Sequence, residues 1–192
     1  MRLRWCVALL GFVSAATAAA AQTESPLTFG LGGSLTVPVG GTPGFGLGGA
    51  GGLDAGWQGI GLLQVRPFGG NFGFQVDGTY QRVGPGAVSY AGRQVFSGTA
   101  NLVYEFGRSR TSMVVPYVIG GAGVYGFHRG MDTNATRFGL SGGAGVNLNL
   151  GLGSIFLEGR LHNVFGAGLG PDGSRSSTQL MPITAGFKIT GP

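Results

Sequence analysis

Charge and cysteine are both scarce in this sequence, and no long apolar run follows its first residues. Charged residues make up only 10% of the 192 residues, whereas a soluble domain usually carries about 25%. The single cysteine, Cys6, excludes a disulfide within the chain and a site built from several cysteine ligands. Basic residues outnumber acidic ones by only 12 to 7 and form no basic run, so nucleic-acid binding is not expected. Low charge without an apolar helix is typical of a protein whose outer surface meets lipid.

The N-terminus has the organisation of a secretory signal peptide. Two arginines precede the apolar run Trp5–Val13, and Ala15–Ala21 offers small residues for cleavage. An N-terminal anchor helix is the alternative, but the apolar run is shorter than the roughly 17–25 residues that span a bilayer. We expect cleavage after Ala21, giving a signal peptide at 1–21 and one domain at 22–192.

Beyond the expected signal peptide, runs of about ten residues alternate between apolar and polar side chains, as in transmembrane β-strands. The clearest run is Ser154–Phe165, whose one face is apolar while the other carries Glu158, Arg160 and His162. Glycine is abundant, with 42 residues, but it shows no period of three and therefore no collagen repeat. The expected strands are Leu27–Val37, Trp57–Pro67, Phe72–Val83, Val95–Phe106, Val114–Phe127, Arg137–Leu150, Ser154–Phe165 and Thr178–Thr190.

The connections between these runs alternate between long and short, beginning with a long Gly/Pro-rich loop at 38–56 and including loops at 128–136 and 166–177. Bacterial outer-membrane barrels have an even number of strands, short turns on one side and longer loops on the other. In hydrocarbon each unpaired backbone group costs several kcal/mol, so such a sheet has to close. We predict an all-β fold, an eight-stranded antiparallel up-and-down transmembrane barrel preceded by a cleavable signal peptide. A soluble secreted β-sandwich is the alternative fold.

The alternation also assigns side chains to two faces, although it leaves the phases of Trp57–Pro67 and Val114–Phe127 open. Eight strands leave a lumen that side chains just fill, and charges there need partners. We expect a polar lumen network with Glu158 and Arg160 at its centre. The predicted lumen residues are Asp77, Glu105, Glu158, Arg160, His162 and Lys188. The predicted lipid-facing residues are Phe74, Val76, Leu102, Leu140, Ile155, Leu157, Leu161 and Phe187. Aromatic residues expected in interface girdles are Phe68, Tyr80, Tyr104, Phe106, Phe127 and Phe165.

Three segments resemble a known family when they are taken with the signal peptide: Phe74–Tyr80, Val115–Tyr125 and Phe156–Arg160. The mature chain resembles the outer-membrane protein β-barrel domain family, the small OmpA/OmpX-like eight-stranded barrels of Gram-negative bacteria. The resemblance implies a location in the cell outer membrane and insertion by the barrel-assembly machinery. Members often end on an aromatic residue that this machinery reads. Here Phe187 is followed by five further residues, so we expect an altered assembly signal.

Few residues suit catalysis. Glu158, Arg160 and His162 share one strand face, an arrangement that acid–base or acyl-transfer chemistry could use. Some outer-membrane barrels modify lipids with a His-x-Ser pair, but here Val164 stands where that hydroxyl would be. With only two histidines a metal site is not expected. The glycine clusters lack the Gly-Lys-Ser/Thr of a phosphate loop. We therefore predict no catalytic, cofactor-binding or metal-binding residue.

The predicted function is that of an integral outer-membrane barrel with a membrane-structural or surface-interaction role, a side-chain-filled polar lumen and no catalysis. Two alternatives stay open: a narrow porin-like passive channel and a lipid-modifying outer-membrane enzyme. The expected partners are outer-membrane lipids, and the barrel-assembly machinery during biogenesis, with a monomer favoured. Lipopolysaccharide is a further expected partner at four arginines, Arg93, Arg129, Arg137 and Arg175.

The phase of Ser154–Phe165 can be tested with two substitutions on opposite faces. Leu157→Arg places a cation in lipid, at a cost of about 2–4 kcal/mol at the bilayer midplane, and is expected to block membrane assembly. Arg160→Leu is expected to fold with reduced stability, because it removes only an interior partner. Heat-modifiable migration on a gel measures both. Equal tolerance of the two substitutions would contradict the assigned faces.

Overall fold

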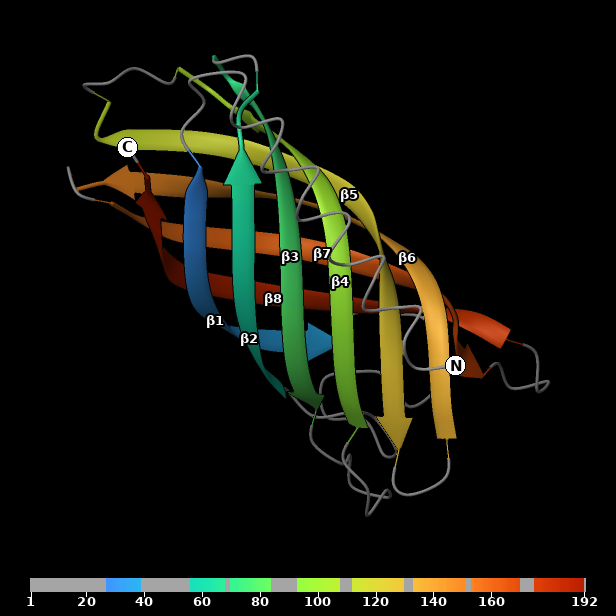
Figure 1. The fold of residues 1–192 in the computed structure, drawn as a ribbon. Helices are drawn as coiled ribbons and strands as arrows, with labels where there is room; N and C mark the ends of the chain where they lie inside the picture. Colours follow the sequence, from blue (N-terminus) through green and yellow to red (C-terminus); the bar gives the residue numbers. More distant parts are fainter. Residues whose placement is uncertain are drawn as a thin grey trace.

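In the computed structural model the chain forms a closed barrel in which each strand pairs with its neighbours in sequence and β1 pairs with β8 (Figure 1). The structure describes residues 27–38, 56–67, 70–83, 93–107, 112–129, 133–150, 153–169 and 175–191. All eight ladders are antiparallel. The strands are β1 (Thr28–Pro38), β2 (Gly56–Val65), β3 (Phe72–Val83), β4 (Arg93–Glu105), β5 (Val114–Arg129), β6 (Thr133–Asn149), β7 (Ser154–Leu169) and β8 (Arg175–Thr190).

The closed eight-stranded antiparallel barrel confirms the predicted architecture. The signal peptide expected at 1–21 lies outside the described residues. Within the part of the chain that the structure describes, no helix has the length and hydropathy needed to cross a membrane. Thr28 and Thr190 are register partners, so the first and last strands begin and end at the same rim, which we call the terminal end. The opposite rim, where β1 leads to β2, β3 to β4, β5 to β6 and β7 to β8, is called the hairpin end.

The structure orients the two strands whose phase the sequence left open. On β2, Trp57 faces outward and is 51% exposed, whereas Gln58 and Gln64 are buried inside. On β5, Tyr117 and Tyr125 point inward and are nearly inaccessible. Both strands therefore alternate like the others, although β5 carries apolar side chains on both faces.

The long loops predicted at 128–136 and 166–177 are wrong. β5 continues to Arg129 and β6 already begins at Thr133, so only 130–132 connects them. Likewise β7 runs to Leu169 and β8 begins at Arg175. The described parts of these segments are strand despite their polar and glycine-rich composition. The long–short alternation of connections therefore does not hold for the last two hairpins.

Between β6 and β7 the barrel wall divides at the hairpin end. Their register runs from Asn149↔Ser154 to Gly139↔Val164, while β6 begins six residues earlier, at Thr133. β7 turns at Gly166, whose φ of 64° is left-handed, and the β7–β8 register shifts between Val164 and Gly168. The β5–β6 and β7–β8 hairpins consequently point in different directions (Figure 1).

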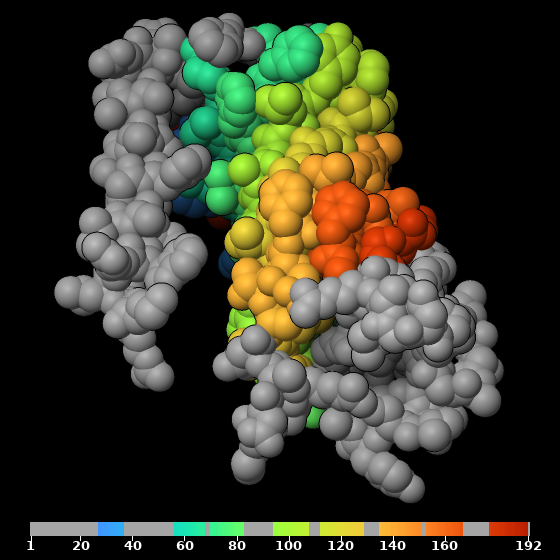
Figure 2. Space-filling model, turned by 90° about the vertical axis from the view of Figure 1, so that its right-hand side faces the viewer, coloured from blue at the N-terminus to red at the C-terminus, as the bar shows by residue number. Residues whose placement is uncertain are grey.

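Side chains bridge this division, which we call the seam, between Thr133–Phe138 of β6 and Phe165–Leu169 of β7. Arg137 Nε donates to the carbonyl oxygen of Gly166 at 2.9 Å. The rings of Phe138 and Phe165 stack with centroids 6.4 Å apart. Space-filling surfaces of β6 in light orange and β7 in deeper orange accordingly meet side by side (Figure 2).

Inward-facing glycines lie where the neighbouring backbone leaves no room for a side chain. A Cβ on Gly143 would overlap the Gly159 carbonyl oxygen and come within 2.8 Å of the Arg160 Cα. A Cβ on the outward-facing Gly159 would meet nothing within 4 Å. The inward glycine therefore allows a close approach of the two strands beside a large lumen side chain.

Gly143 and Gly159 provide a matched test of this close approach. We expect Gly143→Ala to lower the free energy of unfolding by about 1–3 kcal/mol through overpacking, whereas Gly159→Ala should leave it nearly unchanged. Urea unfolding of the protein in lipid vesicles measures both. An equal loss in the two variants would show that strand propensity, and not the close approach, sets the effect.

Candidate functional site

The lumen gathers the buried charges and is the candidate site. Six charged side chains of the described residues are buried, three cationic and three anionic, so their formal charges balance. They are Arg66, Arg160 and Lys188 against Asp77, Glu105 and Glu158. The structure places the predicted lumen residues Asp77, Glu105, Glu158, Arg160, His162 and Lys188 inside the barrel, each at most 6% exposed.

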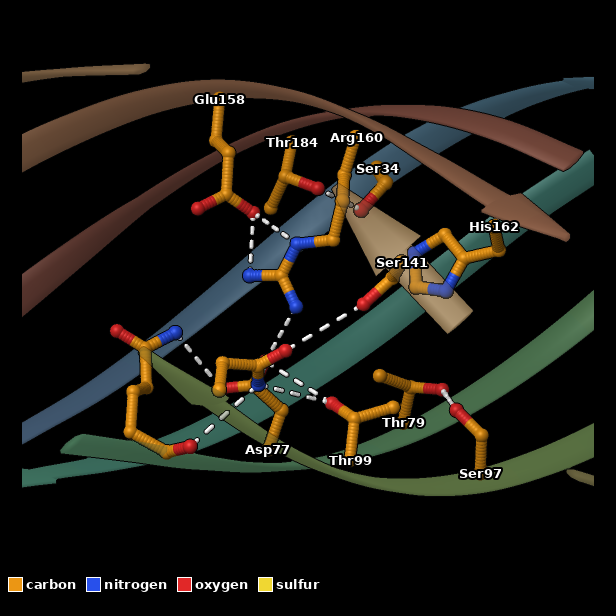
Figure 3. A network of polar contacts seen from close by, with 12 residues as sticks. Ser34, Asp77, Thr79, Ser97, Thr99, Ser141, Glu158, Arg160, His162 and Thr184 are labelled. Carbon is orange, nitrogen blue, oxygen red and sulfur yellow. Dashed lines mark hydrogen bonds and ion pairs between the residues drawn. The ribbon is translucent and has the colours of Figure 1, made fainter. Parts of the chain in front are cut away.

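Arg160 crosses the lumen from β7 and joins two carboxylates (Figure 3). Its Nη2 lies 2.6 Å from Glu158 Oε1, and its Nε donates to the same oxygen at 2.9 Å. Its Nη1 donates to Asp77 Oδ2 at 2.5 Å, which connects β7 to β3 across the interior. Asp77 also accepts hydrogen bonds from three side chains, Gln75, Thr99 and Asn101. The buried cation is thus paired with two carboxylates, the condition under which charge tolerates burial.

A second charged group lies nearer the terminal end. Arg66 Nη2 contacts Glu105 Oε1 at 2.5 Å, and Asn147 Nδ2 donates to the same carboxylate oxygen at 3.2 Å. Lys188 Nζ donates to Asn147 Oδ1 at 3.1 Å. A single amide therefore links a carboxylate on β4 to an ammonium group on β8.

Two aromatic rings hold the Lys188 ammonium group. Its Nζ lies 4.8 Å from the ring centroid of Tyr117 and 4.9 Å from that of Phe156, within the range of a cation–π interaction. Tyr117 also donates its hydroxyl to Glu158 Oε2 at 2.9 Å. Tyr117 thereby connects the second charged group to the Arg160 network.

His162 has a structural setting. Its Nδ1 lies 2.7 Å from the Tyr125 hydroxyl oxygen in a buried hydrogen bond. Ser141 is its register partner on β6, but the Ser141 hydroxyl donates to Asn101 Oδ1 at 3.4 Å. Among the described residues, no hydroxyl is thus bonded to this imidazole except the Tyr125 phenol, and a serine–histidine pair is not assembled.

The lumen becomes apolar toward the hairpin end. Val95, Tyr125, Phe127 and Val164 form a buried cluster from β4, β5 and β7. The proposed girdle position of Phe127 is therefore wrong: the residue is 7% exposed and points inward. Phe127 is the register partner of Val95. The prediction failed because β5 is apolar on both faces, so the sequence did not show which of its side chains point inward.

Aromatic side chains form two outward rows, one near each rim. At the hairpin end Trp57, Tyr80, Phe96 and His128 lie in successive ring contacts across β2 to β5, with centroids 4.8–5.6 Å apart. At the terminal end the contacts run through Phe72, Tyr104 and Phe106. Phe165 faces outward at the seam, and Phe68 lies outside the described residues.

Between these rows the outer wall is apolar. The structure places all eight predicted lipid-facing residues on it, with 43–54% of each side chain exposed. They are Phe74, Val76, Leu102, Leu140, Ile155, Leu157, Leu161 and Phe187. No Lys, Arg, Asp or Glu side chain of the described residues faces outward in the middle of a strand.

The sequence analysis did not identify three lumen residues, because they lie on β5 or directly after β2, the two strands whose inward face it could not assign. Tyr117 and Tyr125 share the inward face of β5 with valine and isoleucine, and no pattern distinguishes them. Arg66 had a usable signal, since Gln58, Gln64 and Arg66 share one parity and all three are buried.

Arg137, one of the four arginines expected at the membrane surface, bonds to Gly166, whereas the side chains of Arg93, Arg129 and Arg175 lie outside the description. Across the described ranges, no cluster of three or more His, Cys, Asp or Glu side chains is arranged to hold a metal ion.

Comparison with solved structures identifies small eight-stranded outer-membrane barrels. Neisserial surface protein A (NspA) matches with a TM-score of 0.59 at 14% identity, covering 87% of this chain and 97% of that protein. The outer membrane protein OprG from Pseudomonas aeruginosa gives 0.49 at 13% identity, over 86% and 95%. Ail, the attachment invasion locus protein of Yersinia pestis, gives 0.43 at 16%, over 86% and 97%. No protein-family model and no curated protein sequence matches the chain. The likeness to NspA confirms the fold that the family resemblance implied.

The Asp77–Arg160 pair should be the most costly lumen contact to break. Asp77→Ala leaves Arg160 paired with Glu158 but removes the acceptor of its Nη1 and of three further buried side-chain donors, and we expect it to lower the free energy of unfolding by about 3–5 kcal/mol. In a double-mutant cycle with Arg160→Ala, urea unfolding in vesicles should give a coupling above about 0.5 kcal/mol. Additive losses would show that the two side chains do not stabilise each other.

Proposed function

We propose that the protein is an integral outer-membrane barrel with a membrane-structural or surface-interaction role, closed to ions and without catalysis. The observation that carries the proposal is the side-chain network that fills a polar lumen inside an apolar wall. The fold shared with small outer-membrane barrels supports the location, and so does the signal peptide expected from the sequence.

The outer wall supports insertion into a bilayer. Large apolar side chains such as Leu31 and Leu35 are 74% and 69% exposed, and similar side chains surround the barrel. Monomeric soluble proteins rarely expose contiguous apolar patches larger than a few hundred Å², which argues against the soluble β-sandwich. Aromatic rows near both rims match the interface girdles of outer-membrane barrels.

The topology supports one orientation of the barrel in the membrane. The first and last strands meet at the terminal end, and the structure's longer strand extensions lie at the hairpin end. In bacterial outer-membrane barrels the periplasmic turns are short. The hairpin end therefore faces the cell exterior in this proposal, and its β5–β6 and β7–β8 extensions present the surface for interaction.

Two barriers inside the lumen, one charged and one apolar, support a barrel that is closed to ions. The Arg160 bridge between β7 and β3 crosses the interior near mid-height, and the apolar cluster around Tyr125 follows it toward the exterior. An ion would have to separate a buried ion pair and then pass an apolar layer. Both steps oppose conduction.

A narrow passive channel remains the second candidate because some lumen groups need water. Among the described residues, buried side-chain atoms of Thr36, Gln64 and Thr178 have no hydrogen-bond partner within the protein. Buried polar atoms of this kind are commonly satisfied by water. Water would then occupy the lumen on both sides of the Arg160 bridge without forming a continuous path through it.

The lipid-modifying enzyme is the weaker alternative. His162 is buried and bonded to Tyr125, so it is not presented toward lipid. A general base has to reach the proton that it abstracts, and this imidazole has no open approach from the outer wall.

Planar-bilayer recordings of the purified protein test the closed lumen. We expect no steady conductance from the wild type, with a general porin in the same bilayers as the positive control. Steady ion channels would overturn the closed-lumen reading in favour of the channel. Heat-modifiable migration and extraction only by detergent check membrane-barrel folding separately, and their absence would overturn the proposed location.

A further inference from the structure

A shallow, open groove of about 600 Å³ lies on the outer wall across β2 to β6. It extends from mid-height toward the hairpin end, below the aromatic row of Trp57, Tyr80, Phe96 and His128. We call it the β2–β6 groove. None of its described lining residues carries a charge.

Missing side chains create the hollow. Gly59, Gly78 and Gly98 line the groove, and a Cβ on any of them would meet no atom within 4 Å. Gly78 and Gly98 are register partners, so the floor is continuous across β3 and β4. Unlike Gly143 inside the barrel, these glycines are not required by close backbone contact. What they provide is space on the lipid side.

The floor of the groove suits an apolar occupant. Of its lining residues, Thr79 and Ser97 alternate with outward-facing neighbours, so their side chains point to the lumen, where the two hydroxyl oxygens lie 2.6 Å apart. The outward lining side chains that carry a hydroxyl are Tyr80 and Thr136, so the groove offers few polar partners to a sugar or a peptide. In a bilayer an empty hollow also forfeits dispersion contacts, which an acyl chain restores.

The upper rim of the groove is cationic. Arg82 is exposed on the same outward face as Tyr80, one alternation closer to the hairpin end, and it is the register partner of Trp57. His128, also exposed, ends the aromatic row on β5. A molecule with its chain on the glycine floor would place its headgroup beside the Arg82 guanidinium. Charge complementarity therefore selects an anionic headgroup, and guanidinium groups bind phosphate well.

We infer that the β2–β6 groove binds one acyl chain of an outer-leaflet lipopolysaccharide, with a phosphate of its lipid anchor at Arg82. The inference rests on the proposed function, which sets the hairpin end in the outer leaflet. It also moves lipopolysaccharide contact from the loop arginines, as the sequence suggested, to the membrane-embedded wall.

Filling the groove tests the inference without disturbing the barrel interior. Gly78→Leu/Gly98→Leu inserts side chains into open space, and Gly159→Leu is the matched control, an outward glycine with equally open space on β7. Labelled lipopolysaccharide is titrated against each protein in phosphatidylcholine vesicles. We expect the filled variant to bind at least about tenfold more weakly, because buried methylenes dominate the affinity. The control should stay within about twofold, as for a surface substitution.

Two further arms identify the headgroup and the lipid source. Arg82→Gln should weaken lipopolysaccharide binding several-fold while leaving the affinity for a chain-matched diacylglycerol, which has no phosphate, unchanged. Phosphatidylglycerol serves as the anionic phospholipid. Equal affinity of the wild type for phosphatidylglycerol and lipopolysaccharide would overturn the assigned source, and equal effects of the filled and control variants would overturn the groove itself.

Folding is verified for every variant by heat-modifiable migration. If the double variant does not fold, Gly59→Leu replaces it at another position of the floor with open space. A wild type that inserts into vesicles but shows no saturable lipopolysaccharide binding would overturn the inference and leave the proposed function intact. A wild type that does not insert at all would instead overturn the proposed function.

Discussion

Pairing of every backbone group within the sheet is the constraint on which the rest of the structure depends. A bilayer offers no water to an unpaired N–H or C=O, so the sheet closes on itself. The ladder between β1 and β8, from Thr28↔Thr190 to Pro38↔Leu180, supplies that closure. Once the sheet is closed, alternation along each strand sends one set of side chains into lipid and the other into a narrow interior. Lumen chemistry is a consequence of this geometry.

Closure also dictates the composition of the interior. Eight strands leave little space, and large side chains such as Tyr117, Phe156 and Arg160 fill it only because inward glycines stand beside them. A Cβ on Gly145 would come within 2.5 Å of the Tyr117 ring. The high glycine content therefore has two separate physical causes. Inside, glycine permits close packing, and on the outer wall at Gly78 and Gly98 it leaves open space.

How much of this the sequence could predict depends on how strictly each strand alternates. β3 was predicted with its observed bounds because Gln75, Asp77 and Gln81 alternate with aromatic and aliphatic residues. β5 has no such contrast, so the inward direction of Tyr117, Tyr125 and Phe127 had to come from the structure. The six predicted lumen residues could be placed by parity, but their partners could not. Arg160 meets Asp77 across 83 residues of sequence, and only the register of the closed sheet brings β7 and β3 to opposite sides of one cavity.

The seam between β6 and β7 separates two parts of the protein that differ in how well they tolerate substitutions. Beyond Val164, β7 pairs only with β8 among the described residues, at Gly168↔Ser176 and Leu169↔Arg175. Its contact with β6 there is carried by Arg137 and by the stacked rings of Phe138 and Phe165. Residues of this hairpin can therefore be exchanged during evolution without disturbing the ladders that close the barrel. The ladders of the barrel wall are in this way insulated from substitutions in the hairpin.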